Sequence, residues 1–228
     1  MDMLNVLFVE AAMEIVPRKI SHHPAVTRNA KRDGKNPEGV LLDRSLHHRA
    51  MLSLPEGEKR GRPDILHFCL LEALGSPLNK AGRLRSMAHT LNGDFIDFAP
   101  ELRLPRECNR FGSLMEQLFA EGRVPPGEEK PLIALARRTL ADVKGDVRPS
   151  RTVALTSHGE PRKLEELCKG LAVEENPLVF LGAYPHGAMR EETLAEVDEA
   201  VSIHPEALEA WVVTSRLVYE YEKACGLE

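Results

Sequence analysis

The sequence predicts an α/β protein with a largely parallel sheet. Two observations lead to this fold class. Short apolar segments of strand length alternate with segments of helical periodicity, most regularly after residue 150, and such alternation is typical of parallel sheets. Three of these apolar segments are also followed directly by loops, the arrangement in which α/β proteins build ligand sites. The 228 residues fit a single domain, residues 1–228, with a basic insertion at about 17–61.

The first elements follow from apolar patterning. NVLFV, residues 5–9, predicts a buried strand, and residues 11–16 favour the start of a helix. The insertion that follows is basic, rich in histidine and interrupted by Pro and Gly, which indicates loops with one short helix. Residues 65–74 are nearly all apolar and predict a buried helix. Pro63 suits the first turn of that helix, and Gly75 ends it.

The middle of the chain predicts a hairpin and two helices. RLRSMAHT and DFIDF read as two strands, and the Asn92-Gly93 pair between them is a strong hairpin signal. An amphipathic pattern predicts a helix at about 111–120, and RVPPGEEKP after it reads as a loop. The apolar residues of 132–143 predict a further helix.

The last part of the chain is the most regular. TVALTS, LVFL and the very short VSI predict strands. PRKLEELCKGL, EETLAEVDEA and PEALEAWVVTSRLVYEYEKA predict the helices that follow them. Because the carboxyl ends of parallel strands meet at one edge of a sheet, the loops LTSHG, LGAYPHG and VSIHPEAL are expected to gather there.

Composition excludes several classes of protein. No apolar run approaches the roughly 20 residues that span a bilayer, and the acidic start predicts no signal peptide, so we expect a cytoplasmic protein. The pairs His22-His23 and His47-His48 have no partner cysteines, so no metal site is expected. Widely spaced cysteines also argue against a disulfide scaffold and favour small buried residues; they are Cys69, Cys108, Cys168 and Cys225.

The charge is unevenly distributed. Residues 1–110 carry 17 Lys and Arg against 14 Asp and Glu, whereas residues 111–228 carry 13 against 21. A polyanion would therefore bind the first half of the chain. Arg103, Arg106 and Arg110 have a spacing that suits phosphate contacts to an RNA loop, although a solvated face paired with nearby glutamates explains them too.

Two loops suggest more specific roles. LGAYPHG, residues 181–187, lacks the glycines of a dinucleotide fingerprint and the Lys-Ser/Thr of a P-loop, so it is not a phosphate cradle. Its glycines allow close backbone approach to a flat heterocycle such as adenine, or simply form a turn. Asp64, at the mouth of the buried helix, caps that helix or holds Arg62 through a charge-assisted hydrogen bond.

Taken together, the segments RGRPDILHFCLLEALGSPLNKAGRL, LRLPRECNRFGSLMEQLF, LGAYPHG and VSIHPEALEAWVVTSRL closely resemble the Nep family, also called Emg. These proteins are ribosomal RNA small-subunit pseudouridine methyltransferases of the SPOUT superfamily. GVLLDRSLHHRAM in the insertion is similar to the archaeal branch. The resemblance implies a SPOUT-type α/β fold whose C-terminal part forms a trefoil knot. It also implies a homodimer.

The resemblance implies S-adenosyl-L-methionine as cofactor and rRNA as substrate. RNA binding falls on Arg62, Arg103, Arg106 and Arg110, with Asp64 organising the first of them and standing as the nearest candidate for a catalytic base. LTSHGEP is the loop least typical of the family, so Leu155 and Thr156 are the weakest of the cofactor-binding matches. The cofactor-binding positions are Leu155, Thr156, Gly182, Gly187, Ala188, Met189, Ile203, His204, Pro205, Glu206, Ala207 and Leu208.

The implied reaction is methylation of ring nitrogen 1 of a pseudouridine in a small-subunit rRNA hairpin loop, where an unpaired base can be splayed into a pocket. Two alternatives stay open. The chain acts chiefly as an rRNA-binding factor in small-subunit biogenesis, with ribosomal assembly proteins as further partners, or it is a SPOUT methyltransferase acting on another RNA base.

Overall fold

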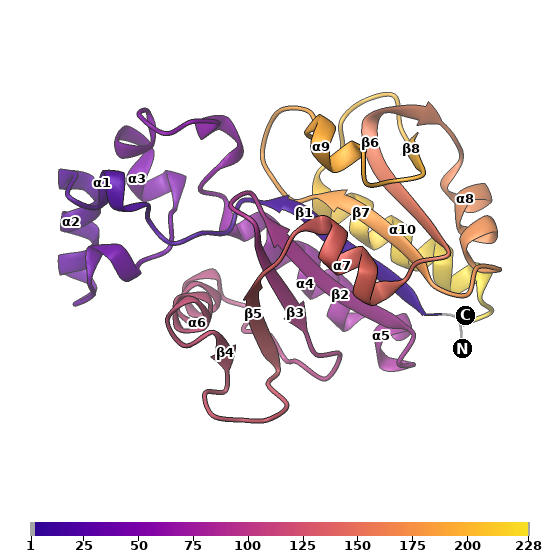
Figure 1. Ribbon diagram of the computed structural model, residues 1–228, viewed down its shortest axis with the longest axis horizontal. Helices are drawn as coiled ribbons and strands as arrows, with labels where there is room; N and C mark the ends of the chain where they lie inside the picture. The colour runs from indigo at the N-terminus through magenta and orange to yellow at the C-terminus, as the bar shows by residue number, and fades with distance from the viewer. Residues whose placement is uncertain (1–2, 228) are drawn as a thin grey trace.

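The computed structural model describes residues 3–227, and within them eight strands form one sheet in the order β4-β5-β3-β2-β1-β7-β6-β8 (Figure 1). Five strands form its parallel part: β1 (Leu4–Ala11), β2 (Leu84–Thr90), β6 (Arg151–Pro161), β7 (Pro177–Gly182) and β8 (Glu199–Ser202). The antiparallel edge consists of β3 (Asp94–Phe98), β5 (Ile133–Arg137) and β4 (Arg123–Val124). The predicted α/β class and the Asn92-Gly93 hairpin are confirmed.

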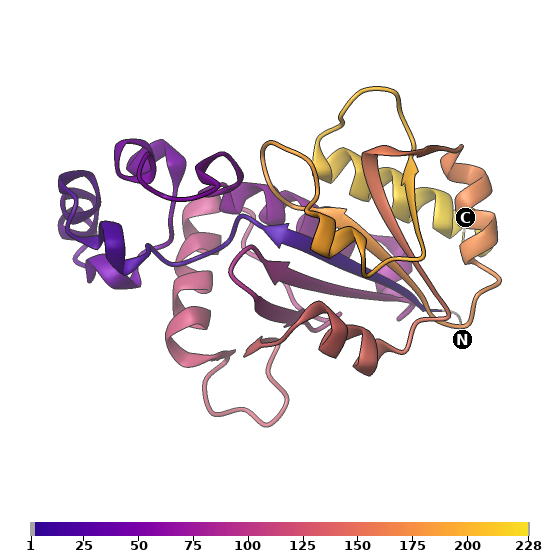
Figure 2. The same cartoon turned by 45° about the horizontal axis from the view of Figure 1, so that its top comes forward.

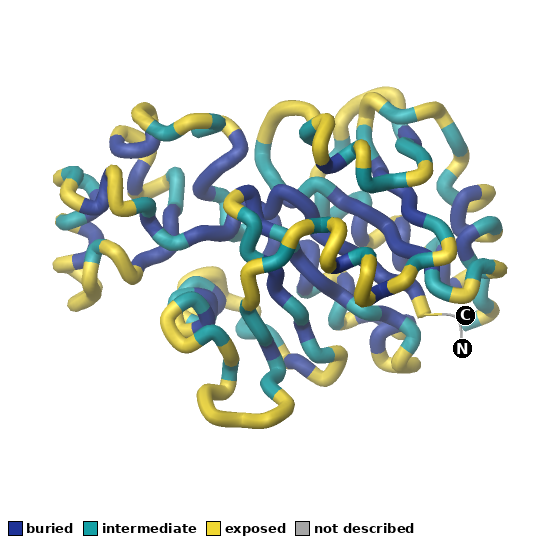
Figure 3. Tube along the Cα trace, in the orientation of Figure 1, coloured by how far each residue is buried: buried dark blue, intermediate teal, exposed yellow. Residues whose placement is uncertain are grey.

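Helices cover both faces of the sheet, and β1 contributes to both cores. Its alternate residues Leu4, Val6 and Phe8 face one apolar cluster, while Leu7 and Val9 face the other. The first cluster includes residues of α4 (Pro63–Gly75), α5 (Pro77–Lys80), α6 (Cys108–Glu121), α8 (Leu164–Leu171) and α10 (Ala210–Ala224). The second includes α7 (Leu140–Val147), and α9 (Glu191–Leu194) packs against it. The central strands are therefore buried on both sides (Figure 3).

The insertion forms a lobe beyond the carboxyl end of β1, seen at the left of Figures 1 and 2. It is more helical than predicted, with α1 (Arg18–Ser21), α2 (Pro24–Arg32) and α3 (Arg44–Met51), and with the 3₁₀ turns η1 (Pro37–Gly39) and η2 (Gly57–Lys59). The lobe buries its own apolar cluster. His23 and Asp43 cap α2 and α3, and buried His47 bonds Asn29, so these histidines are structural.

Three predicted elements are wrong. Residues 12–16 form no helix, because β1 ends in a bulge at Glu10 and the chain leaves for the insertion. The helix predicted over 132–143 is instead strand β5 followed by α7. In EETLAEVDEA only Glu191–Leu194 is helical, since Glu199 and Ala200 already pair with β6.

The described residues also settle two smaller points. Within them, no helix is long and apolar enough to cross a membrane. All four cysteines are free; Cys69 and Cys168 are buried as expected, but Cys108 is exposed at the start of α6, so burial does not account for it.

Candidate functional site

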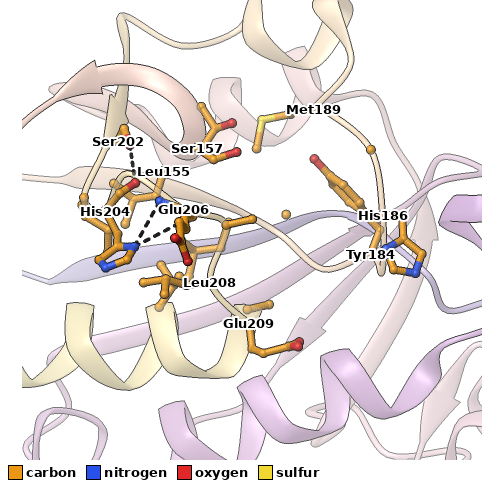
Figure 4. Close-up of a pocket in the computed structure, with 18 of the residues that line it drawn as sticks. Leu155, Ser157, Tyr184, His186, Met189, Ser202, His204, Glu206, Leu208 and Glu209 are labelled. Atoms are coloured by element: carbon orange, nitrogen blue, oxygen red, sulfur yellow. Dashed lines mark hydrogen bonds between the residues drawn. The ribbon is translucent and has the colours of Figure 1, made fainter.

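A cavity of about 400 Å³ lies at the carboxyl edge of the parallel strands (Figure 4). The register of the sheet explains its position, because Leu155 of β6 lies beside both Leu181 of β7 and Val201 of β8. The cavity walls consist of residues 155–157 of β6 and the loops that leave β7 and β8. Ile65 of α4 and Val213 of α10 close it from the helical layer. The three segments expected to meet at one edge do so, but LTSHG is a bulge within β6 rather than a loop after it.

Ten of the twelve residues predicted to bind the cofactor line this one cavity. The two that do not are Ala188 and Pro205, both of which are exposed. The ten come from all three segments and include apolar and polar groups: Leu155, Thr156, Gly182, Gly187, Met189, Ile203, His204, Glu206, Ala207 and Leu208. The structure therefore brings these residues together at one cavity.

Sequence reasoning missed part of the wall. Tyr184, Pro185 and His186 line the cavity from within the LGAYPHG loop, and Ser157 and Glu209 line it from the other two loops. Figure 4 shows Tyr184 and His186 on the side of the cavity opposite His204 and Glu206. A tyrosine between two glycines of a strand-end loop was the signal available for the first of these.

Gly182 makes room for a side chain of its own loop. A Cβ built on Gly182 would lie 2.7 Å from Cε1 and 3.0 Å from Cζ of Tyr184, closer than real Cβ atoms approach. Glycine at 182 therefore allows the tyrosine ring to lie against the strand end. Burial raises the pKa of the Tyr184 phenol, so the ring is neutral at physiological pH. Gly187, by contrast, has φ of +95°, a conformation that favours glycine.

Strand β6 makes a detour next to the cavity. Its ladder with β8 stops at Leu155 and resumes at Glu160, so residues 156–159 bulge from the sheet. Gly159 is pressed against the neighbouring strand, where a Cβ would lie 2.5 Å from backbone atoms of Val201. The detour explains why Thr156 and Ser157 reach the cavity. It also explains the unusual glycine of LTSHGEP.

The far wall of the cavity is polar and acidic. The Ser202 hydroxyl donates to the carbonyl of His204 at 2.9 Å, and the amide of Glu206 donates to Nδ1 of His204 at 3.1 Å. This turn is drawn with dashed lines in Figure 4. It places the carboxylates of Glu206 and Glu209 at the rim. The cavity thus combines apolar walls, which suit a flat ring, with negative charge, which suits a cationic ligand.

Arg62 and Asp64 form a bidentate ion pair at the start of α4. Nε of Arg62 donates to Oδ1 of Asp64 at 2.8 Å, and Nη2 donates to Oδ2 at 2.7 Å. These hydrogen bonds raise the pKa of Arg62, and the carboxylate of the cavity residue Glu209 raises it further. Arg62 is the N-terminal cap residue of α4, and α4 has no side-chain capping hydrogen bond at this end. Of the two roles considered for Asp64, the structure therefore shows the hold on Arg62.

The other three arginines are solvent-exposed. Arg103 and Arg106 lie in the segment before α6, and only Arg110 belongs to that helix, so the three do not share one helical face. Among residues 3–227, no ion pair involves any of them, and the pairing with neighbouring glutamates is not seen. Three exposed cations without counterions remain available to a polyanion. Within the described residues 3–227, no group of three or more His, Cys, Asp or Glu residues could hold a metal ion.

Comparison with known proteins adds to this geometry. Residues 6–222 match the model of the EMG1/NEP1 methyltransferase family. The chain is 43% identical over 215 residues to the ribosomal RNA small subunit methyltransferase Nep1 of Staphylothermus marinus, covering 94% of this chain and 93% of that protein. It is 42% identical over 229 residues to Nep1 of Thermococcus kodakarensis, covering 99% and 100% of the two chains.

A solved structure matches the fold. The crystal structure of Archaeoglobus fulgidus Nep1 bound to S-adenosylhomocysteine superposes with a TM-score of 0.87 at 43% identity, covering 99% of this chain and all of that chain. The fold and the family match thus define the protein as an α/β methyltransferase with the fold of Nep1. The chain belongs to the EMG1/NEP1 methyltransferase family.

Proposed function

We propose that this protein transfers a methyl group from S-adenosyl-L-methionine to ring nitrogen 1 of a pseudouridine in a hairpin loop of small-subunit rRNA. The observation that carries the proposal is the proximity of two sites. Ile65, the residue after Asp64 in α4, lines the strand-end cavity, so the Arg62–Asp64 pair and the cavity share the start of one helix. The charge of Glu209, another residue that lines the cavity, also raises the pKa of Arg62. A donor in the cavity and an RNA loop on the arginines would meet at this point.

The cavity fits the methyl donor. Leu155, Leu181 and Met189 are buried apolar residues on its wall and would pack on the adenine ring. Glu206 and Glu209 place negative charge where the donor is cationic. The Nep1 of Archaeoglobus fulgidus, with the same fold, was crystallised with S-adenosylhomocysteine. The donor supplies an activated methyl group on sulfur, and the protein supplies binding and alignment.

The arginines would bind the RNA. Arg103, Arg106 and Arg110 are exposed cations that would contact phosphates, and this electrostatic term is independent of sequence. Arg62 differs from them because both oxygens of Asp64 fix its guanidinium in one orientation. We therefore assign Arg62 the positioning of the target nucleotide. We assign Asp64 a role through Arg62, because each of its oxygens accepts a hydrogen bond from that guanidinium.

The implied homodimer and trefoil knot remain part of the proposal. Part of the apolar face of α10 is unavailable to a second copy, because Val218 and Tyr221 are buried in the core of a single chain. Phe68 of α4 is exposed, and it packs edge-on against the half-buried Trp211 of α10. This pair of aromatic residues is where a second copy would dock.

The proposal is tested with two synthetic rRNA hairpins that differ only in uridine or pseudouridine at the loop target. Labelled methyl from S-adenosyl-L-methionine is expected only in the pseudouridine hairpin. Incorporation into both hairpins, or into a guanosine, would favour a methyltransferase for another base. Tight binding of both hairpins without incorporation would favour the assembly-factor role. Normal subunit assembly with a cofactor-loop variant that cannot methylate would separate the two roles in the cell.

A further inference from the structure

The loop that joins β7 to α9, residues 183–190, forms one wall of the cavity. Contacts with residues outside the cavity hold this loop in place. Tyr184 and Arg190, near its two ends, both reach a buried ion pair between Glu10 and Lys59. Glu10 comes from the bulge at the end of β1, and Lys59 from the 3₁₀ turn η2 of the insertion. Three segments far apart in the sequence therefore meet behind the cavity.

The pair is buried and has several partners. The side chains of Lys59 and Glu10 are 7% and 4% exposed, and Nζ lies 2.5 Å from Oε2. The other oxygen of Glu10 accepts a hydrogen bond from the amide of Arg190 at 2.7 Å. The Lys59 ammonium also lies 4.5 Å from the ring centroid of Tyr184. A desolvated ammonium over an aromatic ring attracts it more strongly than an exposed one does.

The same turn of the insertion holds the loop at two more points. A Cβ on Gly187 would lie 3.3 Å from Cε of Lys59, so the lysine stem passes directly under that glycine. Glu56 forms a bidentate ion pair with the guanidinium of Arg190. The loop thus rests on residues 56–59, and the chain continues from there to Arg62.

We propose that Lys59 is a positioning residue of the methyl-donor site. Its positive charge is paired with the carboxylate of Glu10, and its ammonium holds the ring of Tyr184 against Gly182. This contact fixes the wall on which the donor binds. The inference rests on the proposed placement of S-adenosyl-L-methionine in this cavity. It gives the insertion a task in placing the methyl donor. Residues 56–62 connect the donor wall to the arginine that positions the nucleotide, so both substrates are placed by one short segment.

A neighbouring ion pair provides a matched control. Arg60 and Glu14 are also buried, with side chains 11% and 5% exposed and Nη1 2.7 Å from Oε2. Their further bonds go to the carbonyl of Pro55 and the side chain of Asn92. None of these residues lines the cavity. Breaking this pair should destabilise the protein to a similar degree without moving the donor wall.

The test measures S-adenosylhomocysteine affinity by calorimetry, well below the melting temperature of each variant. Lys59→Met should weaken binding by roughly tenfold or more, the factor expected from removing a buried cation–π interaction. Lys59→Arg keeps a cation over the ring and should recover most of the affinity. Arg60→Met should lower the melting temperature but leave affinity within about twofold. In methylation assays, the KM for the donor should rise in Lys59→Met while the KM for RNA stays unchanged.

Tyr184→Leu removes the ring and keeps the ion pair, so it can be measured even where Lys59→Met folds poorly, and it should also weaken S-adenosylhomocysteine binding. Where both variants fold, the loss of affinity from both changes together should be smaller than the product of the separate losses. Independent effects, or a loss in Lys59→Met no greater than in Arg60→Met, would overturn the inference. Gly182→Trp tests the donor placement separately, because it fills the cavity wall. Unchanged affinity in that variant would refute the placement itself, whereas loss there with normal binding in Lys59→Met refutes only the role of the lysine.

Discussion

Replacing Gly159 with alanine should destabilise the protein far more than a single methyl group suggests. The added Cβ would lie 2.5 Å from the backbone C and N of Val201 and 2.6 Å from C of Ala200, where contacts under 3.0 Å essentially never occur. The obstacle is the backbone of a paired strand, which cannot rotate away as a side chain can. Overpacking typically costs about 1–3 kcal/mol, and a backbone obstacle places this change near the upper end, at roughly 2–3 kcal/mol.

The assay is urea denaturation of Gly159→Ala beside Gly145→Ala. Gly145 lies within α7, and a Cβ there would meet nothing within 4 Å, so alanine should raise the free energy of unfolding by about 0.5–1 kcal/mol. Gly159→Ala should also weaken S-adenosylhomocysteine binding, because β8 leads into cavity residues 203–208. A Gly159→Ala protein that unfolds at the wild-type urea concentration would show that the β6 detour adapts freely, which would refute this reasoning.

Three further predictions concern RNA binding and pH. Asp64→Asn breaks the bidentate hold on Arg62, so hairpin affinity should fall roughly fivefold, the value of a half-exposed charge pair, with little change in stability. Arg103→Glu combined with Arg106→Glu should reduce the slope of log affinity against log salt by about 1.4 or more, at about 0.7 for each single-strand phosphate that is no longer neutralised. Burial lowers the pKa of His47, so at acidic pH the folded state binds fewer protons than the unfolded state. The free energy of unfolding is therefore expected to be highest above about pH 6.5 and to fall as the pH drops below that value.

Each of these predictions has its own check. Fluorescence titration of a labelled hairpin at several salt concentrations measures the first two. An unchanged salt slope would remove Arg103 and Arg106 from the RNA surface. Unchanged affinity in Asp64→Asn would show that the ion pair is only structural. Unfolding titrations between pH 7 and 5 measure the third. Nδ1 of His47 accepts a hydrogen bond from the amide of Asp43 at 3.1 Å and cannot take a proton without losing that bond. His47→Gln should therefore flatten the pH dependence. An equally steep dependence in the variant would assign the effect to other groups.

Much of the fold could be predicted where local pattern and tertiary structure agree. The buried helix α4, the hairpin of β2 and β3, and strands β6 and β7 follow from apolar periodicity and turn residues. Residues 132–143 show the limit, because Ala and Leu favour a helix and pairing with β3 and β4 made a strand instead. A readable signal was overlooked: Thr139 and Asp142 form a capping box, which marks the true start of α7.

The cavity was easier to predict than the contacts that support it. Three strands followed by loops indicate a shared edge, and resemblance to a known family supplied most of the lining residues. The contact of Tyr184 with Lys59 follows from neither source, because it depends on where the inserted lobe folds back. The same holds for Gly159, whose need for glycine arises from an interruption of the β6–β8 ladder. Contacts between distant segments leave no periodic trace in the sequence.

The central claim is that the bulge of β6 and the loops after β7 and β8 form the methyl-donor site beside the RNA-binding arginines. Amide hydrogen exchange of the full-length protein, followed by mass spectrometry, tests it most directly. S-adenosylhomocysteine is predicted to protect peptides containing residues 155–157, 181–189 and 202–208, and addition of the pseudouridine hairpin to protect residues 62–64 and 103–110. Protection by S-adenosylhomocysteine confined to segments that do not line the cavity, such as α3 and α6, would contradict the account.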